Sequence, residues 1–167
     1  MPAIVAGGIA ETDIPHAITN LYTVQGAAGT SKSTKSTSYV PVDDMAITVN
    51  PDLSCGAIAM FTGSAEQYGA INEYLELGIA IYLDGAMLAE TLFSPYARLD
   101  QVWDDWAGMW IYVPRVTRQN VSIVTAVTNL PAGQHTFQVY FRGNAGFITD
   151  LGNRLLERSL TVMLFYR

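Results

Sequence analysis

The stretch Tyr74–Phe93, "YLELGIAIYLDGAMLAETLF", decides the fold class of this chain. From Leu75 to Leu83 every second residue is Leu or Ile, and the intervening positions are mostly small or polar. This period of two is typical of a β-strand with one buried face. Asp84 and Gly85 follow, and both residue types tolerate the positive φ of a tight hairpin turn. The sequence therefore predicts a hairpin whose second strand completes the stretch.

Strand-like runs continue on both sides of this hairpin, from about residue 38 onward. They are rich in β-branched and aromatic residues and recur roughly every ten to fifteen residues, as in all-β domains. The clearest runs are 45–49, 56–63, 109–116, 121–130, 135–142 and 158–167. Strands do not alternate with helices, which argues against a parallel sheet. We predict an antiparallel jelly-roll sandwich, with helical turns or loops at 64–74 and 94–108.

The final run, "RSLTVMLFYR" at 158–167, places Leu160, Val162 and Leu164 on one face. An apolar strand left at a sheet edge is an aggregation hazard. We therefore expect this strand to lie inside a sheet.

Residues 1–37 differ from the rest of the chain, because no helical or strand period persists in them. A Ser/Thr/Lys run at 30–38 is typical of a solvated linker. A disordered tail is the alternative, but such tails are more charged and less apolar. We predict an extended arm, 1–37, that docks on a neighbouring chain and precedes a β-domain, 38–167. The expected anchors of the arm are Ile4, Val5, Ile14, Ile18, Leu21 and Tyr22.

The composition indicates surplus apolar surface. Half of the 167 residues are apolar and 14% are charged, against about 25% charged residues in typical soluble domains. Contact with other subunits would cover such surface, and one large core is the alternative. The net charge is −6 and Lys32 and Lys35 are the only lysines, which argues against nucleic-acid binding. No apolar run approaches the roughly 20 residues of a membrane span, and the N-terminus lacks a basic signal-peptide region. We expect folding in a cytoplasm, without membrane partners.

The chemistry-bearing residues are few. His16, His135 and Cys55 are too few for a His/Cys metal cluster, and no hydrolase, metalloprotease or phosphate-loop motif is present. His135 begins an alternating strand and has no carboxylate nearby in sequence. We predict a structural histidine held by a backbone or side-chain partner, a buried Cys55, no cofactor, no metal and no enzymatic activity.

Acidic residues at expected turns are the remaining candidates for ion binding. They are Asp43, Asp44, Asp100, Asp104 and Asp105. Carboxylates in loops are calcium ligands in many proteins, but the spacing of a calcium-binding loop is absent. We expect solvated turn acids.

The densest aromatic region contains Trp103, Trp106 and Trp110. Trp106 and Trp110 are four residues apart, which suits one face of a helical turn. Such residues contribute to a core, stack on sugar rings, or anchor a protein interface, where Trp is enriched. We predict a protein interface.

The order of segments beyond residue 33 resembles a known class of proteins. A Ser/Thr-rich stretch, "STKSTSYVPV" (33–42), is followed by "GAIAMFTG" (56–63), "LGIAIYLDG" (77–85), "NLPAGQHTFQVYFR" (129–142) and "RSLTVMLFYR" (158–167). This pattern is similar to trimeric jelly-roll structural proteins of tailed bacteriophages, of the tumour-necrosis-factor or C1q type. Capsid decoration (cement) proteins are the nearest members.

The resemblance implies a function without catalytic residues. The chain would form homotrimers outside an icosahedral head, with Phe165 and Tyr166 near the trimer axis. The arm would clamp neighbouring subunits, the major capsid protein would be the partner, and assembly would occur in the host cytoplasm. The alternative is a tail-fibre or receptor-binding tip that binds host glycans through the tryptophan region.

Overall fold

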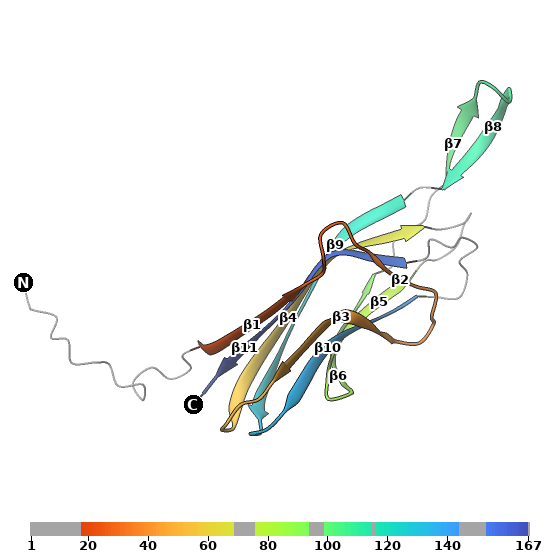
Figure 1. Ribbon diagram of the computed structural model, residues 1–167. Coiled ribbons are helices and arrows are strands. Elements are labelled where there is room, and N and C mark those ends of the chain that lie inside the picture. The colour runs from red at the N-terminus through yellow and green to blue at the C-terminus, as the bar shows by residue number, and fades with distance from the viewer. Residues whose placement is uncertain (1–17, 69–75, 94–98, 115, 144–152, 167) are drawn as a thin grey trace, which may run out of the picture.

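The computed structural model describes residues 18–68, 76–93, 99–114, 116–143 and 153–166, and this part consists of strands and turns without a helix. Its strands form two packed sheets and a separate hairpin (Figure 1), and every pairing is antiparallel. The predicted all-β antiparallel sandwich is therefore confirmed. The strands are β1 (Ile18–Gln25), β2 (Lys32–Thr34), β3 (Val40–Val49), β4 (Cys55–Tyr68), β5 (Leu77–Leu83), β6 (Ala86–Phe93), β7 (Leu99–Asp104), β8 (Met109–Pro114), β9 (Val116–Leu130), β10 (His135–Gly143) and β11 (Asn153–Phe165).

The strand order shows how the chain alternates between the sheets. The larger sheet has the order β1-β11-β4-β9, with β2 also paired to β11, and the smaller sheet has the order β3-β10-β5-β6. Consecutive strands such as β3, β4 and β5 therefore change sheets, as in a jelly roll. The last strand, β11, lies between β1 and β4. Its predicted internal position is confirmed.

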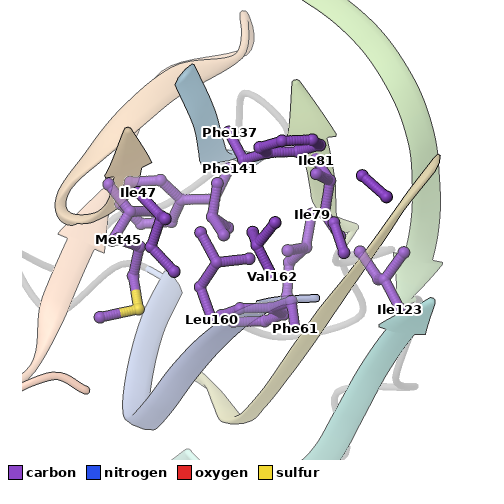
Figure 2. Packing of buried hydrophobic residues seen from close by; sticks show 14 of the residues in the cluster. Met45, Ile47, Phe61, Ile79, Ile81, Ile123, Phe137, Phe141, Leu160 and Val162 are labelled. Carbon is purple, nitrogen blue, oxygen red and sulfur yellow. The ribbon is translucent and has the colours of Figure 1, made fainter. Parts of the chain in front are cut away.

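The core fills the space between the two sheets. Figure 2 shows Phe61, Leu160 and Val162 of the larger sheet together with Ile79 and Ile81 of the smaller one. Each is fully buried, and burying one such side chain contributes about 1.5–3 kcal/mol. Cys55 is also buried, as predicted.

The decisive hairpin forms as the sequence predicts. Leu77, Ile79 and Ile81 of β5 are buried, and β6 returns beside them. Asp84 and Gly85 have φ values of 50° and 83° and form the turn. Leu75, at the start of the predicted face, lies outside the described residues.

Part of the predicted arm belongs to the larger sheet. Strand β1 pairs with β11, and β2, inside the predicted solvated linker, pairs with β11 as well. These two segments, which the sequence assigned to an extended arm and a solvated linker, are therefore strands of the chain's own sheet. Three residues of β2 are too few to show a period, and the outward side of β1 includes Leu21, which hides its alternation. The predicted anchors Ile4, Val5 and Ile14 lie outside the described residues.

The two expected helical or loop segments also contain strands. Ser64–Tyr68 continue β4, and Leu99–Pro114 form the β7–β8 hairpin. The Asp104 carboxylate accepts hydrogen bonds from the N–H groups of Trp106 and Ala107, at 2.9 and 3.0 Å, which stabilises a turn rather than a helix. Trp106 lies in this turn and Trp110 on a strand, so the predicted shared helical face is wrong.

Candidate assembly surfaces

The outer face of the larger sheet carries uncharged side chains in rows that cross β1, β11, β4 and β9. The first row is Leu21, Met163, Ile58 and Ala126, the second is Thr23, Thr161, Met60 and Val124, and the third is Gln25, Ser159, Thr62 and Ser122. Leu21 and Val124 are 64% and 63% exposed. We call these three rows the uncharged face. In its first two rows, Leu21 on β1 and Val124 on β9 are exposed, and Met163 on β11 with Ile58 and Met60 on β4 are half-buried.

Polar and charged groups border the uncharged face beyond its third row. Arg118 donates from Nη2 to Glu157 and from Nε to the Ser64 hydroxyl, both at 2.8 Å. A hollow of about 320 Å³ lies at this border. Its lining is Thr62, Gly63, Ser64, Asn120, Val121, Ser122 and Glu157. An apolar centre beside a polar rim is the composition of many protein–protein interfaces.

The opposite border of the uncharged face carries one of the predicted trimer residues. Phe165 pairs with Gly56, and its ring occupies the place of a Gly56 side chain, because an added Cβ would lie 2.1 Å from Cε2. Tyr166 instead packs against the core, where burial raises the pKa of its hydroxyl. Of the predicted arm anchors, Leu21 lies on the uncharged face, and Tyr22 packs against the core of its own chain.

The predicted tryptophan interface lies elsewhere, on the β7–β8 hairpin. Trp103 and Trp110 are directly opposite each other, with ring centroids 5.5 Å apart and planes at 71°. Trp106, in the turn, is 97% exposed. Figure 1 shows the hairpin projecting from one end of the sandwich. The structure therefore separates the tryptophans from Phe165.

A third surface, on the outer face of the smaller sheet, was missed by sequence reasoning. Tyr82 and Tyr140 lie with ring centroids 4.1 Å apart, and the Arg142 guanidinium lies 5.3 Å from the Tyr39 ring centroid. Tyr39 donates to Glu90, and burial with this bond raises its pKa to about 12. The outward alternation of Tyr140 and Arg142 was a signal in the sequence, but their partners come from other strands.

His135 is held by both its ring nitrogens. Nδ1 lies 2.7 Å from the Asp84 carboxylate and Nε2 lies 3.1 Å from the Pro131 carbonyl oxygen. Asp84 also accepts a hydrogen bond from the Thr136 N–H at 2.8 Å. The bonds from His135 and Thr136 lower the pKa of the Asp84 carboxyl. The sequence predicted a backbone or a side-chain partner, and the structure has one of each, the carboxylate coming from a distant turn.

Arg158 is the largest buried polar side chain in the described residues, with 2% exposure. The register of β11 shifts between Leu156 and Ser159, and Glu157 has a φ of 41°. This bulge turns Arg158 inward, where Nε donates to Asp44 at 3.0 Å and Nη2 donates to the second Asp44 oxygen. The guanidinium also donates to the Thr30 carbonyl oxygen at 3.2 Å. The expectation that Asp44 is a solvated turn acid is therefore wrong.

The other acidic residues differ in their surroundings. Asp43 is exposed and lies 3.5 Å from Lys32, while the Asp104 carboxylate is bonded to the hairpin turn. Within the described residues, His, Cys, Asp and Glu side chains form no group of three or more that could hold a metal. The same part of the chain contains no helix long and apolar enough to cross a bilayer.

Comparisons with known proteins give similar solved structures only. No protein-family model and no curated protein sequence matches the chain. Dimeric latent PorU from Porphyromonas gingivalis aligns over 92% of this chain and 13% of its own, with 10% identity and a TM-score of 0.47. Infectious bursal disease virus, Gx strain, aligns over 86% of this chain and 32% of its own, with 14% identity and a TM-score of 0.47. The Gt strain of that virus gives a TM-score of 0.41 at the same identity and coverage. The chain thus spans a third or less of each of these proteins.

Proposed function

We propose that this chain is a virion structural protein that forms homotrimers on the outside of an icosahedral phage head and stabilises it. The single observation that carries the proposal is the uncharged face, which leaves Leu21, Met60, Val124 and Met163 partly or largely exposed across four strands. A monomer would keep this apolar area in water. Packing against other copies removes it, at about 25 cal/mol per Å² of apolar area.

The geometry of β11 favours self-association through this face. Met163, Thr161 and Ser159 of the last strand contribute one residue to each of its three rows, between β1 and β4. The proposed trimer would bring three copies of these residues together, with Phe165 at one border. The number three comes from the resemblance to trimeric phage proteins.

The proposed clamp is the segment before β1. It joins the sandwich at Ile18, which pairs with Phe165 beside the uncharged face. An arm leaving a trimer at this point would reach a neighbouring subunit or the major capsid protein. Several weak contacts per trimer would then act at high effective concentration.

Sedimentation velocity tests the assembly. Three chains of 18.2 kDa give a trimer of about 55 kDa. Val124→Glu places a carboxylate in the second row of the uncharged face, on β9, and is expected to yield the 18.2 kDa monomer. The matched control is Leu53→Glu, since Leu53 is 69% exposed and lies off this face. An assembled Val124→Glu variant, or a wild-type chain that stays monomeric at every concentration, contradicts the proposal.

Location on the head is tested separately. Mass spectrometry of purified empty heads should detect the chain, and deletion of residues 1–17 should lower its retention on heads while leaving the trimer intact. Detection in isolated tail fibres and not in heads would favour the fibre-tip function instead. Against a sugar-binding platform, the Trp103 and Trp110 rings meet at 71° and share no common flat surface.

A further inference from the structure

All three tryptophans of the chain lie on the β7–β8 hairpin. Trp106 is 97% exposed, Trp110 is 60% exposed and Met109, beside it, is 56% exposed. The neighbouring Trp103 packs edge to face on Trp110. These rings cost free energy in water, and their pairing holds two of them in a fixed arrangement. A projecting apolar tip of this kind needs a partner to cover it.

The hairpin and the start of β1 are at opposite ends of the sandwich. Ile18 pairs with Phe165, and Phe165 pairs with Gly56 at one end of β4. The hairpin is inserted before β9, whose first residue, Val116, pairs with Tyr68 at the other end of β4. Strand β4 has 14 residues, so the two ends are roughly 45 Å apart at about 3.3 Å per residue. A partner bound at Ile18 therefore leaves the tryptophans free for a second one.

The charge of the hairpin selects the chemistry of that partner. Between residues 99 and 114 there are three acids, Asp100, Asp104 and Asp105, and no lysine or arginine. The Asp104 carboxylate accepts hydrogen bonds from backbone N–H groups of the turn, but Asp105 at the tip is exposed. An anionic bilayer surface would repel this tip, and a second copy of a chain with net charge −6 is a poor counterpart.

We infer that the tip of the β7–β8 hairpin is a plug for an apolar pocket, rimmed by Lys or Arg, on a second protein of the particle. Trp106 enters the pocket, the Trp103–Trp110 pair lines its mouth, and Asp105 meets the cationic rim. The inference rests on the proposed virion function. It adds a second docking contact, at the end of the sandwich opposite the arm.

Particles stripped of this protein are the probe for the test. Cosedimentation of the wild-type trimer with them is compared with that of Trp106→Ala, whose fold is unaffected because the side chain is in solvent. We expect about 30-fold weaker binding, as for a central interface anchor. Leu53→Ala, at a similarly apolar exposed position away from the hairpin, should bind as wild type. Unchanged binding of Trp106→Ala overturns the inference.

Two substitutions of Asp105 test whether the rim of the pocket is cationic. Asp105→Asn should weaken binding several-fold and reduce its salt dependence, while Asp105→Lys should bind less well than Asp105→Asn. If Asp105→Lys binds more tightly than wild type, the rim is not cationic and the inference fails.

Tryptophan emission separates other partners, because every tryptophan reports on the hairpin. Phosphatidylcholine vesicles, phosphatidylglycerol vesicles and an oligosaccharide panel should leave the emission maximum unshifted. A blue shift with vesicles or with a sugar assigns the tip to that ligand and overturns the protein pocket. Absence of the chain from particles defeats the proposed function, whereas presence with Trp106-independent binding defeats only the plug.

Discussion

The guanidinium of Arg158 is paired with the carboxylate of Asp44 across the two sheets, and the ion pair is shielded from water on the arginine side. The Arg158 side chain is 1% exposed and the Asp44 side chain is 33% exposed. Hydrogen bonds from Arg158 to the Thr30 carbonyl and hydroxyl connect the same group to the segment between β1 and β2. The bulge of β11 thus holds the first strands of the chain against the sandwich.

Removal of the Asp44 carboxylate should lower the free energy of unfolding far more than removal of the Arg158 guanidinium. Asp44→Ala leaves a buried cation without its partner and should lower the free energy of unfolding by about 3 kcal/mol or more. Arg158→Met removes the buried guanidinium and leaves the partly exposed Asp44 carboxylate. The free energy of unfolding should therefore fall by less in this variant. Urea denaturation at fixed protein concentration measures both variants. Asp43→Ala, whose Lys32 pair is exposed, is the control and should cost less than about 1 kcal/mol. Equal losses for Asp44→Ala and Asp43→Ala would show that the buried pair does not stabilise the fold.

The Asp84–His135 pair predicts an acid-dependent loss of stability. The hydrogen bond from His135, then that from Thr136, lowers the pKa of Asp84. A depressed carboxyl pKa contributes stability above the unfolded value, near pH 4, and this contribution is lost as the pH falls through the folded value. Asp84→Asn keeps a residue type that tolerates positive φ and should flatten the decline in unfolding free energy below about pH 4. Chemical denaturation at a series of pH values measures this slope. An unchanged slope would exclude Asp84 as a source of the acid sensitivity.

Gly56 allows the Phe165 ring to lie over β4. An alanine at this position must displace the ring, because the added Cβ would overlap Cε2. We expect Gly56→Ala to lower stability by about 1 kcal/mol or more and to weaken self-association, since Phe165 borders the uncharged face. Sedimentation equilibrium provides the association constant. Gly29→Ala, which strains the backbone at a φ of 73° but displaces no side chain, is the comparison for association. Intact association in Gly56→Ala would place Phe165 outside the interface.

The hairpin turn depends on Gly108, which has a φ of 62° and space around it. Gly108→Ala should therefore cost about 1 kcal/mol of local stability through the backbone alone. We expect the edge-to-face pair of Trp103 and Trp110 to give an exciton signal in circular dichroism, and this signal should melt at lower temperature in the variant. Loss of the signal with unchanged melting of the sandwich would show that the hairpin unfolds locally. An identical melting curve for the exciton signal would contradict the role of Gly108.

The alternation of apolar residues and the turn motif predicted those strands, turns and buried faces that depend on neighbouring residues alone. The alternation before Asp84-Gly85 predicted β5 and its turn, and the alternation within 135–142 and 158–167 predicted the inward faces of β10 and β11. Strand β8 was predicted within 109–116, but β7 and the hairpin turn were missed because the spacing of Trp106 and Trp110 fits a helix. Only the hydrogen bonds that the Asp104 carboxylate accepts show the turn.

Long-range features could not be read from one chain. Asp44 and Arg158 are 114 residues apart, and nothing in "LERS" at 156–159 indicates a bulge that turns Arg158 inward. The uncharged face likewise depends on pairing between strands that are distant in sequence. Leu21, Met60 and Val124 lie on separate strands, and only the register between these strands places them on one surface.

The placement of Ile18 and the hairpin at opposite ends has a mechanical consequence. Tension between a partner at one end and a partner at the other would pull β1 and β9 in opposite directions along their lengths. The ladders β1–β11, β11–β4 and β4–β9 that connect them would be loaded in shear, with their hydrogen bonds perpendicular to the force. Many bonds must then break together rather than one at a time. A sandwich loaded in this way resists extension, which suits a protein that bears tension between two anchored surfaces.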